Sequence, residues 1–146
     1  EAPTTLLDLG CGYGYLSMQA SQQGFTQITG TDNNAAALSA TAKNFQQLNI
    51  DNSLIAGDAG NQITGRFDTV LCNPPFHQGF SVDGDMAVKF LSATKRLLNR
   101  SGQALFVVNN FIPLEQKAKA YFRYIDVLAN NGSFKLIALA HQSVKN

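Results

Sequence analysis

The segment TTLLDLGCGYG, residues 4–14, is the part of the chain that most constrains its fold. Its apolar first half, residues 4–9, predicts a core strand, and a helix is expected from about residue 15 to residue 23. Glycines between a strand and a helix let the chain turn sharply and let a ligand approach the backbone and the helix N-terminus. A dinucleotide-binding fingerprint would place a third glycine at position 15, where Tyr15 stands, so dinucleotide binding is disfavoured.

Short strand patterns and helical patterns alternate along the rest of the chain. We expect strands at 25–32, 52–58, 66–73 and 101–110. Helices are expected at 33–49, with Asn33 or Asn34 as its cap, and at 85–99, with apolar residues at Val88, Leu91, Leu97 and Leu98. Strands separated by helices of this length pair in parallel through right-handed crossovers.

The end of the chain departs from this alternation. A helix is expected near residues 115–124, and residues 125–140 then form two strands around an Asn131-Gly132 turn, a pair favoured in tight hairpins. The predicted fold class is therefore α/β, with a mostly parallel seven-stranded sheet and a C-terminal antiparallel hairpin.

Composition restricts the domain organisation. A chain of 146 residues that is 45% hydrophobic and 14% charged suits one globular domain, residues 1–146. It has no apolar run of about 18 residues and no signal-peptide pattern, so we expect a cytoplasmic protein. The sequence has no initial Met and starts almost directly with a core strand, which suggests a fragment of a longer chain.

Cysteine content and charge exclude some classes and favour others. Cys11 and Cys72 are too few for a disulfide scaffold or a zinc site, so we expect reduced, buried thiols and no metal. Residues 1–65 hold five acids and one base, a net charge of −4, whereas residues 66–146 hold five acids and ten bases, a net charge of +5. The basic half suits an anionic substrate such as nucleic acid, although solvated helix faces explain the same counts.

The loop DLGCGYG, residues 8–14, resembles the first motif of S-adenosylmethionine-dependent methyltransferases of the Rossmann-like class I fold. The resemblance implies that Asp8 steadies the amino-acid end of the cofactor, that Asp32 binds the ribose, and that Asp58 and the Ala59 N–H bind the adenine. Each aspartate alone could instead be a helix cap or a turn former. The expected cofactor-binding residues are Asp8, Gly10, Gly12, Gly14, Asp32, Asn33, Asp58 and Ala59.

The segment NPPF, residues 73–76, ends the fourth predicted strand. The Asn73 side-chain oxygen and the Pro74 carbonyl can each accept a hydrogen bond from a planar amino group, which aligns its nitrogen for methyl transfer. The Phe76 ring offers a stacking face for a base. We therefore expect Asn73, Pro74 and Phe76 to be catalytic. His77 could act as a general base or only orient the loop.

The motif resembles that of methyltransferases acting on adenine N6, guanine N2 or the glutamine amide. With GRFD (65–68), VVNNFIPL (107–114) and NGSFKLIALA (131–140), NPPFH is similar to the catalytic domain of the RsmC family of small-subunit rRNA guanine-N2 methyltransferases. That resemblance implies a ribosomal RNA or ribosomal-subunit partner and a further amino-terminal domain. The alternatives are a large-subunit rRNA enzyme, an adenine-N6 or glutamine-N5 methyltransferase, and a non-catalytic RNA-binding module. A basic stretch predicted on one helix could meet phosphates or be a solvated face: Lys89, Lys95, Arg96 and Arg100.

Overall fold

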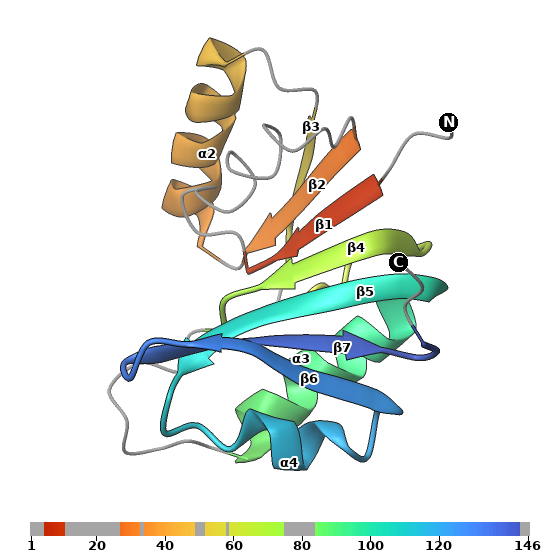
Figure 1. Cartoon of the computed structure of the whole chain (residues 1–146). Helices are drawn as coiled ribbons and strands as arrows, with labels where there is room; N and C mark the ends of the chain where they lie inside the picture. Colours follow the sequence, from red (N-terminus) through yellow and green to blue (C-terminus); the bar gives the residue numbers. More distant parts are fainter. Residues whose placement is uncertain are drawn as a thin grey trace.

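The computed structural model describes residues 5–10, 27–32, 34–48, 52–57, 59–74 and 84–143. These residues form one seven-stranded sheet in the order β3-β2-β1-β4-β5-β7-β6 (Figure 1). Its strands are β1 (Thr5–Leu9), β2 (Gln27–Asp32), β3 (Asn52–Ala56), β4 (Phe67–Cys72), β5 (Leu98–Asn109), β6 (Tyr124–Asn130) and β7 (Phe134–Ala140). The first five pair in parallel, whereas β7 runs antiparallel to β5 and β6 antiparallel to β7. The predicted fold class is confirmed.

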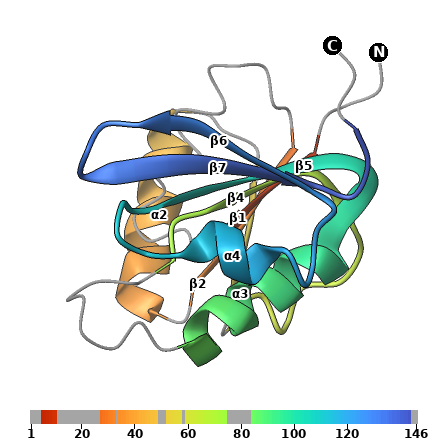
Figure 2. The ribbon, with the colours of Figure 1, turned by 60° about the horizontal axis from the view of Figure 1, so that its bottom comes forward.

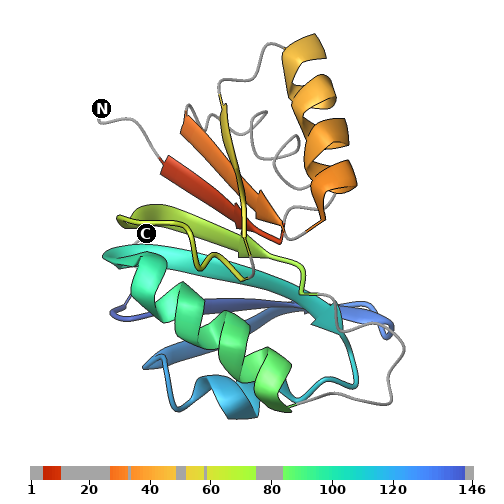
Figure 3. The ribbon, with the colours of Figure 1, turned by 180° about the vertical axis from the view of Figure 1, so that it is seen from behind.

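Helices cover both faces of the sheet. The helix α2 (Ala35–Gln47) packs on one face, where its Phe45 joins Leu6 and Ile28 in a small core. The helices α3 (Gly84–Leu97) and α4 (Leu114–Ala118) contact each other on the opposite face (Figure 2). There they bury the larger core, and Figure 3 shows α3 in front of the sheet. None of the described helices is long and apolar enough to cross a bilayer.

The start of α2 follows from one asparagine. Of the two candidate caps, Asn34 is the one observed: its Oδ1 accepts hydrogen bonds from the N–H groups of Ala36 and Ala37 at 3.0 and 3.1 Å. The other candidate, Asn33, lies outside the described residues. A cap of this kind satisfies amide groups that have no partner within the helix.

The apolar face of α3 is shifted from the one predicted. Leu91 and Leu97 are fully buried as expected, but Val88 is 41% exposed, and Leu98 is the first residue of β5 rather than part of the helix. Among residues 86–97 of α3, the buried ones are Ala87, Phe90, Leu91, Ala93, Thr94 and Leu97. Because 3.6 residues make one turn, Ala87, Phe90, Leu91 and Thr94 share one face while Val88 points away from it.

The helix expected at residues 115–124 is much shorter than predicted. α4 ends at Ala118, whose carbonyl accepts from the N–H groups of both Tyr121 and Phe122 at 2.9 Å, so the chain turns out of the helix there. This turn buries Phe122 and starts β6 at Tyr124.

The C-terminal hairpin is confirmed, with its reversal one residue later than expected. The Asn131 N–H donates to the Phe134 carbonyl at 3.1 Å, so the chain reverses over Gly132 and Ser133. Gly132 has a φ of +91°, a value that L side chains rarely adopt. The Asn131 Oδ1 accepts from the N–H groups of Ser133 and Phe134, which stabilises the turn.

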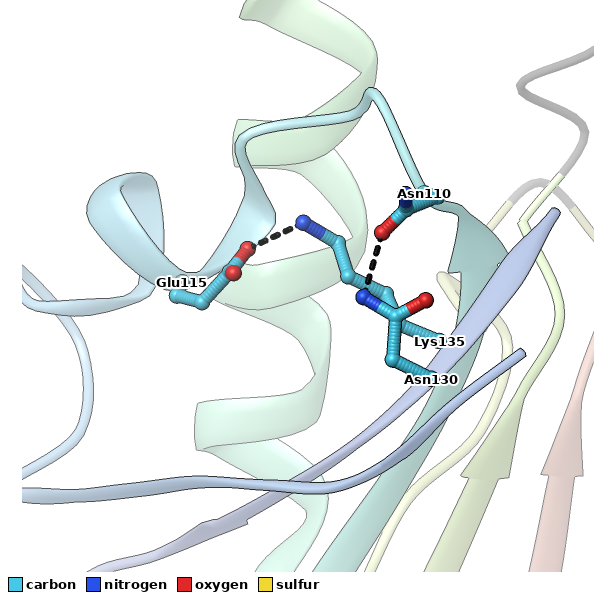
Figure 4. A network of polar contacts seen from close by, with 4 residues as sticks. All are labelled: Asn110, Glu115, Asn130 and Lys135. Carbon is cyan, nitrogen blue, oxygen red and sulfur yellow. Dashed lines mark hydrogen bonds and ion pairs between the residues drawn. The ribbon is translucent and has the colours of Figure 1, made fainter. Parts of the chain in front are cut away.

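Two polar contacts join the hairpin to α4 and to the segment before it (Figure 4). The Lys135 ammonium, only 7% exposed, donates to the Glu115 carboxylate at 2.7 Å, and the Asn130 Nδ2 donates to the Asn110 Oδ1 at 2.6 Å. Burial by itself raises the pKa of the Glu115 carboxyl. The hydrogen bond and the charge of Lys135 outweigh burial, so that this pKa lies below its ordinary value of 4.5.

This ion pair predicts a pH-dependent contribution to stability. A carboxyl whose pKa is lowered on folding stabilises the native state fully above its unfolded pKa, and the contribution is lost as the pH falls through the folded value. Glu115→Gln should therefore lower the urea midpoint at neutral pH and have a smaller effect well below pH 4.5. Asp126→Asn, which changes an exposed carboxylate on β6, is the matched control. Equal destabilisation by Glu115→Gln at both pH values would contradict this account.

Candidate functional site

Three neighbouring strands end at the same edge of the sheet. β1 lies between β2 and β4, and the Gly10 N–H after β1 donates to the Thr31 carbonyl of β2 at 2.8 Å. On its other side, Leu9 pairs with Cys72 of β4. Neighbouring strands lie about 4.8 Å apart, so Asp32 at the end of β2 and Asn73 after β4 are separated by roughly 10 Å across the sheet. The structure thus brings Gly10, Asp32 and Asn73 to one edge, as the sequence predicts.

Gly10 is needed for its backbone conformation. Its φ is +76°, and a Cβ built there would meet the Phe90 ring at 3.6 Å, which is an ordinary contact. A side chain would therefore fit in the space, but the backbone angle would be strained. Gly12 and Gly14, the other glycines expected to bind the cofactor, lie outside the described residues.

Asp32 accepts hydrogen bonds at the turn from β2 into α2. Its Oδ1 accepts from the Asn34 N–H at 2.9 Å, and its main-chain carbonyl accepts from the Gly57 N–H at 3.1 Å. The first contact orients the carboxylate at the strand end, and the second ties the end of β2 to the segment after β3. Asn33 and Asp58, also expected to bind the cofactor, lie outside the described residues.

Asp8 and Cys72 are buried at the middle of this edge. Asp8, on β1, is 1% exposed, and the free thiol of Cys72 is fully buried. Burial raises the pKa of Cys72 well above its usual value, and the charge of Asp8 raises it further. A thiol that stays protonated is a poor nucleophile, so the structure gives Cys72 a packing role. Cys11 lies outside the described residues.

Ala59 lies in a tightly braced loop after β3. It has a φ of +49°, and the next residue, Gly60, packs so closely that a Cβ there would lie 2.8 Å from a methyl of Leu9. The Arg96 guanidinium of α3 donates to the carbonyls of Gly60 and Ile63 at 3.0 and 2.9 Å. Arg96, predicted as part of a basic surface stretch, therefore braces this loop. Between the loop and α3 lies a pocket of about 430 Å³ lined by Ala59, Asn61, Lys89, Ser92, Ala93 and Arg96.

The two described residues of the NPPF motif differ in exposure. Asn73 is exposed and Pro74 is buried, directly after the last residue of β4. The amide of Asn73 is thus open to a substrate, while the buried ring restricts movement of the Pro74 backbone. Phe76, the third expected catalytic residue, and His77 lie outside the described residues.

An exposed aromatic residue that the sequence analysis did not single out follows the next strand of the sheet. Phe111 is 59% exposed, although its neighbour Ile112 is fully buried. The Asn110 N–H donates to the Ser133 carbonyl at 2.8 Å, and the Asn110 side chain accepts from Asn130 (Figure 4). The hairpin therefore holds the residue before Phe111, and the core holds Ile112 after it. The sequence feature that could have indicated Phe111 is an aromatic residue directly after the end of a predicted strand, in the segment NNFIP.

No group of three or more His, Cys, Asp or Glu side chains that could hold a metal ion occurs within the described ranges.

Comparison with known proteins places these features in a family. The chain is 35% identical over 142 residues to ribosomal RNA small subunit methyltransferase C of Haemophilus influenzae (strain PittGG), covering 97% of this chain and 42% of the relative. It is 36% identical over 132 residues to the protein of that name from Erwinia tasmaniensis, covering 90% of this chain and 39% of the relative. The chain thus spans about two fifths of the length of these curated relatives.

Solved structures agree with this assignment. The T. thermophilus 16S rRNA N2 G1207 methyltransferase (RsmC), in complex with AdoMet and guanosine, is 26% identical and superposes with a TM-score of 0.87, covering 94% of this chain and 37% of that chain. The ribosomal protein L11 methylase of Lactobacillus delbrueckii, at 21% identity and a TM-score of 0.82 over 97% of this chain and 72% of that chain, shows the fold alone. The family described as methyltransferase small domain matches residues 1–138, so the chain belongs to that family.

Proposed function

We propose that this chain is the catalytic part of an enzyme that transfers a methyl group from S-adenosylmethionine to the exocyclic N2 amino group of a guanine in ribosomal RNA, most directly small-subunit 16S rRNA. The observation that carries the proposal is the similarity to small-subunit methyltransferase C over 97% of the chain, together with an exposed Asn73 directly after β4. A ribosomal RNA substrate implies action in the cytoplasm.

The carboxyl edge of the sheet is proposed to hold the cofactor. Gly10, with its positive φ, offers a close backbone approach, and the oriented carboxylate of Asp32 accepts hydrogen bonds from the ribose hydroxyls. Ala59, which borders the 430 Å³ pocket, offers its N–H to the adenine. Asp8, Gly12, Gly14, Asn33 and Asp58 complete the proposed set. When bound, S-adenosylmethionine supplies an electrophilic methyl group on a sulfonium.

Asn73 and Pro74 are proposed to hold the target amino group. The lone pair of an exocyclic amino group is delocalised into the base, so the nitrogen is a poor nucleophile until it is pulled toward tetrahedral geometry. Two oxygen acceptors, the Asn73 side chain and the Pro74 carbonyl, take its two N–H groups and direct its lone pair. The nitrogen loses one proton after it has gained the methyl group, and water can accept that proton. Phe76 is proposed to stack on the base, and His77 to orient the loop or to act as the base.

Phe111 is proposed to contact the RNA beside the target guanine. β5 lies next to β4, and Phe111 is held 59% exposed just beyond its end. Stacking of a base on an aromatic ring is worth about 1 to 3 kcal/mol.

Methylation assays separate this proposal from its alternatives. The protein is incubated with cofactor labelled in its methyl group and with undermethylated small subunits, large subunits, DNA or release factor, and the labelled product is identified after hydrolysis. We expect N2-methylguanosine from small subunits. The same product only from large subunits would favour the large-subunit rRNA enzyme. N6-methyladenine would favour an adenine-N6 methyltransferase, and methylglutamine would favour a glutamine-N5 methyltransferase. RNA binding without transfer to any substrate would support a non-catalytic module and overturn the proposal.

Asp32→Asn should weaken cofactor binding. The substitution keeps an oxygen that can accept from the Asn34 N–H but removes the charge and one acceptor needed by the ribose. A loss of about 1 to 3 kcal/mol is expected for hydrogen bonds left unmade, measured by calorimetry. Asp126→Asn on the far strand β6 is the matched control and should bind normally. An unchanged affinity in the folded Asp32→Asn variant would refute the ribose assignment.

Asn73→Ala should slow the chemical step. The amide oxygen acts mainly in the transition state, when positive charge develops on the target nitrogen. We expect a single-turnover rate about 100-fold lower, or about 2.7 kcal/mol of barrier, with cofactor affinity nearly unchanged. Transfer at the parental rate would disprove the proposed role of the amide.

Phe111→Ala provides the contrast to that variant. Stacking acts in the ground state and the transition state alike, so this change should weaken RNA binding and alter the rate at saturating RNA far less. Phe111→Tyr should restore binding, whereas Leu128→Ala, which removes another exposed apolar side chain, should have no effect.

A further inference from the structure

The amino edge of the sheet, opposite the edge that carries Asn73, contains a basic groove. It has a volume of about 800 Å³ and is lined by Arg66, Lys95, Asn99, Arg100, Ser101, His141 and Gln142. Arg66 directly precedes β4, Lys95 is in the last turn of α3, the next three residues are at the start of β5, and the last two directly follow β7. Of the basic residues predicted on one helix, Lys95 and Arg100 therefore meet here, although Arg100 lies on β5.

A bulge in β5 forms one wall of the groove. Phe67 of β4 pairs with Leu98, but Thr69 pairs with Gln103, so β5 contains extra residues between these two pairs. The bulge is fixed by its neighbours: the Asn99 Nδ2 donates to the Asp68 Oδ1 at 2.8 Å, and the Arg66 Nη1 donates to the Leu98 carbonyl at 3.0 Å. Bulges redirect side chains, and this one, at the start of the interior strand β5, leaves Arg100 and Ser101 exposed.

Closely packed backbone supports the same bulge. A Cβ on Gly102 would lie 2.6 Å from the Asp68 main-chain oxygen, so only glycine allows β5 to approach β4 this closely. The close approach of the β4 and β5 backbones thus fixes the bulge that carries Arg100.

The electrostatics of the groove favour an anion. Three cations, Arg66, Lys95 and Arg100, line it, and none of its lining residues is acidic. The nearby Asp68 carboxylate already accepts from Asn99 and from the Thr5 N–H. His141 stacks on Phe122 with ring centroids 5.0 Å apart. Burial lowers the pKa of His141, a hydrogen bond with the Lys95 backbone opposes this, and the positive charges of Lys95, Arg66 and Arg100 add to the lowering.

We propose that this groove binds phosphates of the RNA substrate at a distance from the target guanine. The inference rests on the proposed function. The six residues of β4 span about 20 Å at 3.3 Å per residue, so one nucleotide cannot occupy both the groove and the site at Asn73. Cations interspersed with the neutral donors Asn99, Ser101 and Gln142 suit phosphate oxygens. A concave groove fits a nucleic acid backbone better than a flat lipid surface.

The test is the salt dependence of RNA binding by the full chain. A fluorescein-labelled RNA hairpin with guanines in its loop is titrated with Lys95→Gln/Arg100→Gln and with Lys43→Gln/Lys119→Gln. The control pair removes the same charge from exposed positions outside the groove. Each lost phosphate contact in a single strand lowers the slope of log K against log salt by about 0.7, so the groove variant should lose about 1.4 and the control almost nothing. Equal losses in the two variants would overturn the proposal.

Further measurements separate the groove from the proposed reaction. Cofactor affinity, measured by calorimetry, should be the same in both double variants. In the unsubstituted protein, the pKa of His141, followed by NMR, should rise when the RNA hairpin binds, because the phosphates offset the charge of the neighbouring cations. Three outcomes would each refute the groove as an RNA site. The first is an unchanged His141 pKa, and the second is full displacement of the hairpin by inorganic phosphate at an equal phosphate concentration. The third is tighter binding to anionic phosphatidylserine vesicles than to RNA. A slope difference in a protein that methylates no RNA would leave the groove supported and refute the proposed function alone.

Discussion

The structure depends on the parallel pairing of β1 with β2 on one side and β4 on the other. β1 is buried on both faces, with Leu6 in the core under α2 and Leu7 and Leu9 in the core under α3. A strand in this position cannot shift by one residue without moving these side chains to the wrong face, so the register is strongly specified. The register in turn sets Gly10 beside Thr31 and Leu9 beside Cys72, and through them the positions of Asp32 and Asn73.

The features that local sequence predicted well are those with a local physical cause. The strand and helix alternation follows from hydrophobic pattern, the cap of α2 from the hydrogen-bonding side chain of Asn34, and the hairpin from the backbone freedom of Gly132. The features it missed have nonlocal causes. α4 is short because the chain turns after Ala118 and Phe122 packs into the larger core, and Leu98 joins β5 because it pairs with Phe67. Neither partner is visible from the nearby residues alone.

The same distinction applies to the candidate site. Residue types at strand ends indicated Gly10, Asp32 and Asn73 because the ends of parallel strands converge whatever the details of packing. Which basic side chains form internal hydrogen bonds and which line a surface groove could not be predicted in this way. Arg96 and Lys95 are adjacent in sequence, yet Arg96 donates to the carbonyls of Gly60 and Ile63 while Lys95 lines the groove. Which of two neighbouring cations is used internally depends on a loop more than 30 residues away.

β4 connects the two proposed contacts with the substrate. It begins beside Arg66 in the groove and ends next to Asn73, and it pairs with a strand along each of its sides. A central strand held in this way changes length very little, so the separation of the two contacts is set by its six residues rather than by a mobile loop. If RNA phosphates occupy the groove, the length of β4 fixes the distance between these phosphates and the methyl-transfer site. Selection of one guanine then requires that guanine to lie at the matching distance in the folded RNA, which adds a geometric criterion to recognition of the base itself.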